Sequence, residues 1–390
     1  MKSLLSTFVT GMALLVSTIG GTAGPASAGS APPTLECDGA WHIAASDSPA
    51  SRFNDLLAVT AVSPSLAWAV GDGYAGAGVP RTLIERWDGT SWIGVPSPNA
   101  GHQGSQLLGV AAPDAGHAFA VGARSVVGDR NRTLVEQYDG VSWSIVPSPN
   151  RGPGYSVLSG VSALSGSDAW AVGARQLPSG AQAPLVEHWN GNSWSYVRSP
   201  FFRRSPQTVL LDVAAVSADD VWAVGTYYSG DKHENQPLTE HWDGTSWSIL
   251  PAAFPGRDYA FSSLTAPAAD DVWAVGYQAS GGGPLAEHWN GSSWSVVAIE
   301  NPGTQSLFLG VAVAGSSVYA TGVSDDPGPH NTLAERFTGS AFERVSTPNV
   351  NGTRFENGLR RAASDGTTIW SVGHHDVHHG RTQTLVEYAC

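Results

Sequence analysis

The sequence predicts an all-β protein, a seven-bladed β-propeller of four-stranded antiparallel blades, from three observations. A motif like Trp-Ala-Val-Gly recurs seven times, each unit holds four short strand-like segments, and no segment has the apolar period of a helix. The glycines that close the motif are Gly71, Gly122, Gly173, Gly225, Gly276, Gly322 and Gly373. Their spacings are 51, 51, 52, 51, 46 and 51 residues, which predicts one closed ring rather than separate domains.

The first unit illustrates the strands that each blade is expected to contain. Apolar or alternating segments cover residues 56–62, 67–70, 81–87 and 91–95. Asp88-Gly89 predicts a two-residue hairpin between the third and fourth strands. A longer polar loop is expected over residues 72–80, between the second and third strands.

The seventh unit lacks a fourth strand, because the chain ends after its third at residues 384–387. The missing strand is expected at the other terminus, where Asp38-Gly39-Ala40-Trp41 resembles the repeated Asp-Gly-x-x-Trp. The N-terminal strand would therefore close the ring by completing the last blade. In this alignment Cys37 and Cys390 meet at the junction of the third and fourth strands, which predicts a disulfide between them.

The N-terminus has the pattern of a secretory signal peptide. Lys2 precedes an apolar run over residues 4–19, and Ala26-Ser27-Ala28 forms a small-x-small cleavage site. We expect residues 1–28 to be a signal peptide, 29–36 a short linker, and 37–390 a single propeller domain of a secreted protein. A membrane anchor is the competing interpretation of the apolar run, and no later stretch is long enough to span a bilayer.

The charge balance limits the possible partners. Without Lys2 the mature chain keeps 19 basic and 33 acidic residues, a net charge of −14, which disfavours nucleic acid and anionic membranes. Of the 20 basic residues in the whole chain, 18 are Arg, whose guanidinium pairs with carboxylates and phosphates in a bidentate way. We expect a monomer.

The repeat resembles that of a known family. Trp-Ala-Val-Gly, followed by Leu-x-Glu-His-Trp-Asp-Gly-Thr-Ser-Trp-Ser, is similar to a kelch repeat, and the resemblance covers residues 37–390. Most units have one Gly where kelch repeats have two. The resemblance implies a propeller like the central domain of galactose oxidase. Such propellers serve as binding platforms and as enzymes, so the fold does not choose between these functions.

The aromatic residues are expected to pack between blades. All 15 Trp occupy three repeated positions, and a residue required in nearly every blade indicates framework rather than a binding platform. A repeated Glu and the His that follows it in three units are expected to serve the framework too, the Glu through a hydrogen bond or ion pair within each blade. These Glu are Glu85, Glu136, Glu187, Glu240, Glu287, Glu335 and Glu387. Aromatics free to stack on a ligand would come from irregular positions: Tyr74, Tyr155, Phe201, Phe202, Tyr227, Tyr228, Tyr259 and Phe355.

The two faces of the ring are expected to differ in charge. The tight turns of one face carry Asp and neither Lys nor Arg, whereas the loops between blades on the other face carry Arg. We predict a ligand-binding loop face with Arg52, His102, Arg151, Arg203, Arg204, Arg257 and Arg354, together with Tyr155 and Tyr259. The alternative is ordinary solvated loops, with local partners such as Asp55, Asp258 and Glu356.

A histidine-rich tract lies on the same face, in the expected loop between the second and third strands of the last blade. Its members are His374, His375, Asp376, His378 and His379. Neutral imidazoles bind divalent metals such as Zn, Cu or Ni, so the tract is a candidate metal site. Adventitious metal binding or a plain polar loop is the competing interpretation, and no other cofactor is predicted.

These observations favour a secreted, non-enzymatic binding module that recognises an extracellular glycan or protein through its Arg-bearing loop face. Repetition without a catalytic constellation is the reason. The alternative is an extracellular enzyme, a hydrolase, lyase or metal-dependent oxidase, with its site at the axial mouth of the ring.

Overall fold

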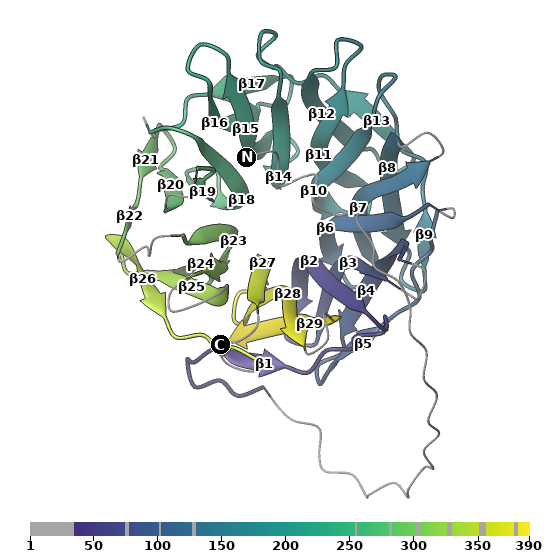
Figure 1. Cartoon of the computed structure of the whole chain (residues 1–390), viewed down its shortest axis with the longest axis vertical. Helices are drawn as coiled ribbons and strands as arrows, with labels where there is room; N and C mark the ends of the chain where they lie inside the picture. Colours follow the sequence, from purple (N-terminus) through teal and green to yellow (C-terminus); the bar gives the residue numbers. More distant parts are fainter. Residues whose placement is uncertain are drawn as a thin grey trace, which may run out of the picture. The chain divides into compact units, whose positions relative to one another are not determined.

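A computed structural model describes residues 35–74, 78–100, 103–126, 130–253, 256–280, 283–300, 305–325, 330–350, 356–377 and 381–390. Residues 36–390 form one compact unit of seven antiparallel sheets arranged around an axis (Figure 1). The predicted seven-bladed propeller is therefore confirmed. The predicted signal peptide and residues 29–34 of the linker lie outside the described part of the chain.

Each blade contributes one strand to each of four positions, from the axis outwards. The innermost strands are β2 (Phe53–Ser63), β6 (Ser105–Asp114), β10 (Ser156–Ser165), β14 (Thr208–Ser217), β18 (Tyr259–Ala268), β23 (Leu307–Ala314) and β27 (Asn357–Ser364). The second strands are β3 (Leu66–Tyr74), β7 (His117–Val126), β11 (Asp168–Gln176), β15 (Asp220–Ser229), β19 (Asp271–Gln278), β24 (Ser317–Ser324) and β28 (Ile369–Val377). The third strands are β4 (Pro80–Trp87), β8 (Arg130–Tyr138), β12 (Gln182–Trp189), β16 (Glu234–Trp242), β20 (Pro284–Trp289), β25 (Asn331–Phe337) and β29 (Arg381–Ala389). The outer strands are β5 (Trp92–Gly94), β9 (Trp143–Ile145), β13 (Trp194–Val197), β17 (Trp247–Leu250), β21 (Trp294–Val296), β26 (Ala341–Val345) and β1 (His42–Ala44).

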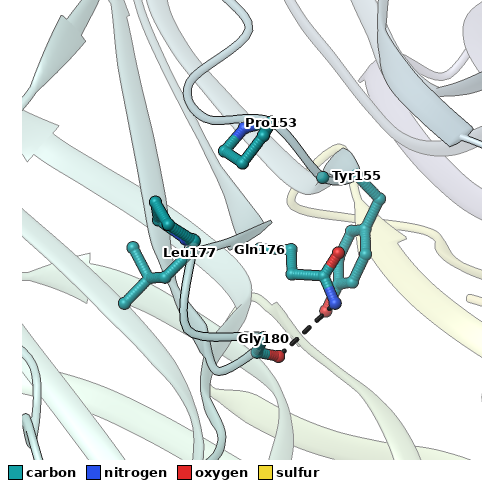
Figure 2. Close-up of a pocket in the computed structure, with 7 residues that line it drawn as sticks. Pro153, Tyr155, Gln176, Leu177 and Gly180 are labelled. Atoms are coloured by element: carbon teal, nitrogen blue, oxygen red, sulfur yellow. Dashed lines mark hydrogen bonds between the residues drawn. The ribbon is translucent and has the colours of Figure 1, made fainter.

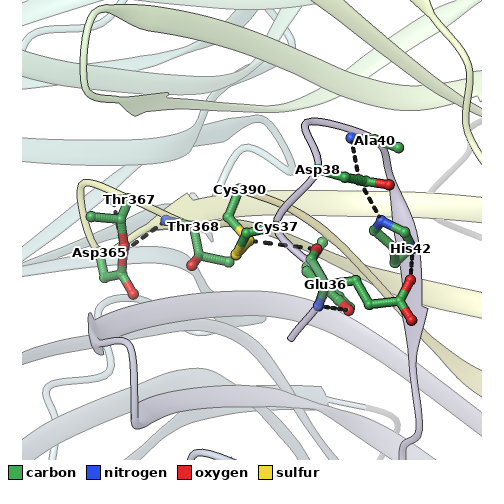
Figure 3. The surroundings of a disulfide bond; sticks show 10 residues. Glu36, Cys37, Asp38, Ala40, His42, Asp365, Thr367, Thr368 and Cys390 are labelled. Atoms are coloured by element: carbon green, nitrogen blue, oxygen red, sulfur yellow. Dashed lines mark hydrogen bonds and ion pairs between the residues drawn. A yellow bond between two sulfur atoms is a disulfide. The ribbon is translucent and has the colours of Figure 1, made fainter. Parts of the chain in front are cut away.

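The two ends of the chain close the ring in one shared sheet. Strand β1 pairs antiparallel with β29, which gives the strand order β1-β29-β28-β27 in blade 7. Cys37 and Cys390 form a disulfide with their Cα atoms 4.8 Å apart, beside the β1 edge (Figure 3). The Gly39 amide also donates to the Cys390 carbonyl at 3.1 Å. Both the split blade and the disulfide are as the sequence predicts.

The repeated Gly is required by a close approach of two strands. Each innermost strand has a register shift, for example between Leu56 and Ala58 of β2, opposite the second strand. A Cβ at Gly71 would collide with the backbone carbonyl of Asp55, and the equivalent glycines of the other blades face the same obstacle. Only Gly allows this bulge, which explains why the position recurs in every unit.

Three local details differ from the sequence-based expectation. The Asp-Gly hairpin is not a two-residue turn, because Trp87 pairs with Trp92 and leaves four residues between the strands. In that turn the Asp88 carboxylate accepts hydrogen bonds from Thr90 and Ser91, so the Asp holds the loop itself. Strand β3 runs on to Tyr74, into the expected loop, and blade 6 gains a fifth strand, β22 (Ala298–Ile299), parallel to β26.

The repeated aromatic residues pack between blades, as predicted. A ring on each second strand meets rings on the third or fourth strand of the next blade. Trp68, for instance, lies 4.9 Å from Tyr138 and 5.2 Å from Trp143, centroid to centroid. The last junction repeats this arrangement, with Trp370 of blade 7 at 4.9 Å from Trp87 and 5.3 Å from Trp92 of blade 1. These residues are framework.

The repeated Glu is buried in every blade, and in five blades it is hydrogen-bonded to the neighbouring blade rather than within its own. Ser97, which follows the outer strand of blade 1, donates to Glu136 of blade 2 at 3.0 Å, and Ser199 donates to Glu240 at 2.6 Å. For these five Glu the prediction of a hydrogen bond is confirmed, and its placement within a blade is wrong. Burial raises the pKa to about 8, against the lowering effect of the Ser hydroxyl, for Glu85, Glu136, Glu187 and Glu240.

Candidate functional site

The turn face, where the first and third strands of each blade end, uses its Asp residues for local structure. The Asp243 carboxylate accepts from Thr245 and Ser246, and these hydrogen bonds lower its pKa to about 2. His188, His241 and His288 each bond an Asp of the second strand at 2.8 Å and stack on the neighbouring Trp. These repeated groups therefore have structural partners.

An ion pair crosses the axis of the ring between two innermost strands. Arg361 of β27 reaches Asp212 of β14, three blades away, through Nη1, and its Nη2 donates to the Leu211 carbonyl at 2.9 Å. The Asp212 carboxylate also accepts from the Ser263 hydroxyl and the Leu264 amide of blade 5. Both charged side chains are 17% exposed, so one guanidinium ties blades 4, 5 and 7 together at the axis.

A second charged group, which we call the mouth cluster, joins blades 7 and 1 at the loop face. It consists of Asp55, Asp72, Arg360 and His374. The Asp55 carboxylate is 3% exposed and lies 2.9 Å from Nδ1 of His374 and 3.5 Å from Nη2 of Arg360. Burial acts to raise the pKa of Asp55, but the charges of His374 and Arg360 outweigh it and hold that pKa below its ordinary value.

Asp72 lies directly across the β2–β3 ladder from Asp55 and has the opposite protonation tendency. Burial, with a further contribution from the charge of Asp55, raises the pKa of Asp72 to about 7. The other blades carry Ala, Thr, Tyr, Val or His at the position of Asp72. Two carboxyl groups whose pKa values are pushed apart beside an imidazole are typical of acid–base sites, and also of buried structural networks.

The histidine-rich tract does not come together as a metal site among the residues that can be placed. His374 is bonded to Asp55, the Asp376 carboxylate accepts from Thr382, and His375 is buried, which lowers its pKa. His378 and His379 lie outside the described residues. Within the described ranges no group of three or more His, Cys, Asp or Glu side chains could hold a metal ion.

Four Arg side chains on the loop face of blades 2 and 3 form what we call the arginine cluster: Arg124, Arg132, Arg151 and Arg175. Arg124 of β7 and Arg132 of β8 are direct cross-strand partners. Nη1 of Arg132 donates to the Gly154 carbonyl at 3.1 Å, in the loop that enters blade 3. The cluster thus spans the boundary between the two blades.

Tyr196 of β13 holds the other two members. The guanidinium carbon of Arg151 lies 4.5 Å from the centre of the Tyr196 ring, and that of Arg175 lies 5.6 Å from it. Such distances permit cation–π attraction. Nε of Arg175 is buried without a hydrogen-bond partner among the residues that the structure places.

A shallow pocket of about 280 Å³ opens beside the cluster (Figure 2). It is lined by Pro153, Gly154, Tyr155, Gln176, Leu177, Pro178 and Gly180. The Gln176 amide donates to the Tyr155 carbonyl at 2.9 Å and its side chain to the Gly180 carbonyl at 3.4 Å, which fixes the two sides of the pocket. Burial raises the pKa of Tyr155 to about 12, so its hydroxyl stays protonated.

Acidic side chains do not balance this region in the described parts of blades 2 and 3. Glu136 and Glu187 are fully buried, and Asp114, Asp139 and Asp168 belong to the turn face. None of the four Arg side chains forms an ion pair with a residue that the structure describes. The cluster is therefore a local excess of positive charge on a chain of net charge −13.

The residues predicted from the sequence are spread around the loop face. Arg52, Arg203, Arg204 and Arg257 are exposed in separate loops, Tyr259 is half-buried, and His102 and Arg354 lie outside the described residues. Only Arg151 and Tyr155 belong to the region of the cluster and pocket. Arg124, Arg132, Arg175 and Tyr196 were missed, although Gly-Ala-Arg after the repeated strand occurs in units 2 and 3 alone.

These features define the class of protein: a seven-bladed β-propeller whose ring is closed by its N-terminal strand and a disulfide. No protein-family model matches the chain, and the search of curated proteins found no sequence match. In particular, no match supports the kelch or galactose-oxidase resemblance.

The chain is similar in structure to YCF48 bound to a D1 peptide, with a TM-score of 0.56 and 14% identity over 92% of this chain and 100% of that one. It is also similar to YCF48 from Cyanidioschyzon merolae, with a TM-score of 0.54 and 14% identity over 90% of this chain and 98% of that one. At this level of identity, the similarity concerns the fold alone. Among the described residues, no helix is long and apolar enough to cross a bilayer.

Proposed function

We propose that this propeller is a secreted binding module that recognises a protein partner through its loop face. One observation carries the proposal. The repeated Trp, Glu and His residues serve the framework, whereas the loop face departs from the repeat with a pocket and with four Arg side chains that form no ion pair to a described residue, namely Arg124, Arg132, Arg151 and Arg175. Loops on a rigid scaffold are where binding usually occurs.

Two further points support this proposal. A propeller of similar fold has been solved as a complex with a peptide, which makes a protein ligand the first candidate ahead of a glycan. Secretion would place the Cys37–Cys390 disulfide in an oxidising compartment, where such bonds persist. The kelch-like character of the repeat stays a prediction.

The test is selection of peptide ligands from a displayed library on the purified protein. We expect enriched peptides to bind saturably, to lose affinity in the loop-face variant R203Q/R204Q or Y155A, and to keep it in the turn-face variant D270N. Peptides that bind all these variants equally, or no enrichment at all, would contradict the proposal.

A second candidate function, an extracellular enzyme at the axial mouth, is favoured by the mouth cluster alone. Asp55 bonded to Nδ1 of His374 would leave Nε2 as a base, and Asp72 with a pKa near 7 could act as an acid. A screen for polysaccharide cleavage tests it. Turnover that is lost in H374N would establish an enzyme, and absence of turnover on every polymer tried would leave the binding proposal as the better one.

A further inference from the structure

We infer that the arginine cluster binds an acidic peptide segment, with an apolar side chain of that segment seated in the pocket beside Tyr155. This inference rests on the proposed function, because it assigns a place and a partner chemistry to binding on the loop face. It concerns blades 2 and 3 only.

Among the residues that the structure describes, the cluster has no acidic counter-charge. Like charges directly opposite each other on a strand pair destabilise a sheet, and Arg124 and Arg132 are such a pair. On blade 7, by contrast, Arg360 and Arg361 each have an Asp partner in another blade of the same chain. In blades 2 and 3 no described carboxylate takes that place, so an anion from outside would complete the arrangement.

Contacts between neighbours connect Arg132, Arg151 and Arg175 to the pocket, and Arg124 lies opposite Arg132 on the neighbouring strand. Arg132 holds the Gly154 carbonyl, and Gly154 and Tyr155 form one wall of the pocket. The opposite wall begins at Gln176, next to Arg175, which shares the Tyr196 ring with Arg151. A bound segment that contacts two of these Arg side chains would therefore pass the pocket mouth.

The chemistry of the site favours a peptide over a sugar polymer. A neutral sugar ring binds by stacking on an open aromatic face, but Tyr196 is approached by two guanidinium groups and Tyr155 is half-buried in the pocket wall. Guanidinium groups pair with carboxylates in a bidentate, planar way. The lining of the pocket is mixed, and Pro153, Leu177 and Pro178 are the apolar residues against which one hydrophobic side chain of a peptide would pack. A uniformly charged glycan has no such side chain.

The experiment measures fluorescence anisotropy with a labelled twelve-residue peptide that alternates Glu and Ser around one central Leu. Two matched peptides replace every Glu by Gln, or the Leu by Ser. The protein variants are R124Q/R132Q, R151Q/R175Q and Y155A. The controls are R381Q and R336Q, which remove exposed Arg side chains away from the cluster.

We expect saturable binding of the Glu peptide that weakens at least about tenfold in each double variant, since each loses two charge-assisted contacts. The Gln peptide should not bind, and the Leu-to-Ser peptide and Y155A should each weaken binding about threefold to tenfold. The affinity should fall as salt rises, with a smaller salt dependence in the double variants. Both control variants should bind as the unchanged protein does.

Three outcomes overturn the inference. If the Glu peptide does not bind at low salt, the inference is wrong. Tighter binding of heparin with the same dependence on the four Arg side chains would assign the surface to a sulfated polymer instead. If R52Q or R203Q abolishes binding and the double variants do not, a loop-face site exists elsewhere, and the proposed function survives without this inference.

Discussion

The Arg side chains of two regions of this propeller differ in whether they form an ion pair with an Asp of the same chain. On blade 7, Arg360 is paired with the buried Asp55 of blade 1, and Arg361 is paired across the axis with the half-buried Asp212 of blade 4. On blades 2 and 3, Arg124, Arg132, Arg151 and Arg175 have no acidic partner within the described chain. The first group holds the fold together, and the second is left available to something outside it.

The contrast has an energetic basis. A buried charge costs free energy unless a partner satisfies it, so Asp55 and Asp212 require their cations. A guanidinium on the half-exposed loop face remains hydrated or rests on Tyr196, and it loses little when unpaired. Removing a paired Arg should therefore damage stability, whereas removing an unpaired Arg should damage binding alone.

The largest effect is expected where the ring is closed covalently. Replacing both cysteines, C37S/C390S, should lower the free energy of unfolding by about 5 kcal/mol, because the disulfide closes a loop of nearly the whole chain. Denaturant unfolding followed by tryptophan fluorescence measures this change. Reducing agent should lower the stability of the unchanged protein and leave the double variant unaffected. Equal stability of the two proteins under oxidising conditions would refute a role for the disulfide in closure.

The axial ion pair should come next. R361M removes the cation and leaves the Asp212 carboxylate largely buried, with the neutral donors of Val213, Ser263 and Leu264. We expect a loss of about 3 kcal/mol, measured by the same unfolding experiment. R336M, at an exposed position without an ion pair to a described residue, is the matched control and should change stability by less than about 0.5 kcal/mol. Similar losses in R361M and R336M would mean that the ion pair between Arg361 and Asp212 does not contribute to stability.

The buried Glu framework predicts that stability falls as pH rises from about 4.5 to about 8. Each of four Glu, namely Glu85, Glu136, Glu187 and Glu240, has a folded-state pKa of about 8, above its unfolded value of 4.5. Its stabilisation is therefore complete below about pH 4.5 and is lost as pH rises through 8, with a slope of up to about 1.4 kcal/mol per pH unit per group. Melting temperatures should decrease from pH 5 to about pH 8 and level off between pH 8 and pH 9.

A single substitution isolates one member of this framework. E240Q keeps a neutral, hydrogen-bonding side chain opposite Ser199, so it should cost little at pH 5 and should reduce the alkaline loss at pH 9. A turn-face variant, D243N, is the control, because hydrogen bonds hold the pKa of that Asp low and its charge does not change in this range. An E240Q protein with the same pH profile as the unchanged protein would show that Glu240 is ionised when folded.

The sequence predicts the framework well because the framework repeats. The Gly, the Trp positions and the Glu recur in seven units, so the strand assignment of one unit can be checked against the others. The incomplete last unit indicates how the ring closes. The mouth cluster is harder to foresee, since it joins Asp55 to His374 across 319 positions with no repeat to align them. The arginine cluster depends on the cross-strand register and on the path of the loop over residues 151–155. Neither can be predicted from knowing which residues lie in loops. The sequence thus indicated Arg151 and Tyr155 but not the Arg side chains beside them.

The smallest effect on stability is expected where the Arg side chains are unpaired. R124Q and R151Q should each change the free energy of unfolding by less than about 0.5 kcal/mol. For R124Q the sign should be stabilising at low salt, because the substitution relieves the repulsion between Arg124 and Arg132. Denaturant unfolding at low and at high salt resolves this sign, since screening should remove the gain. A loss of several kcal/mol in the free energy of unfolding of R124Q would mean that the Arg124 side chain has a structural partner. Arg124 would then belong with the paired Arg side chains and would not be available to a ligand.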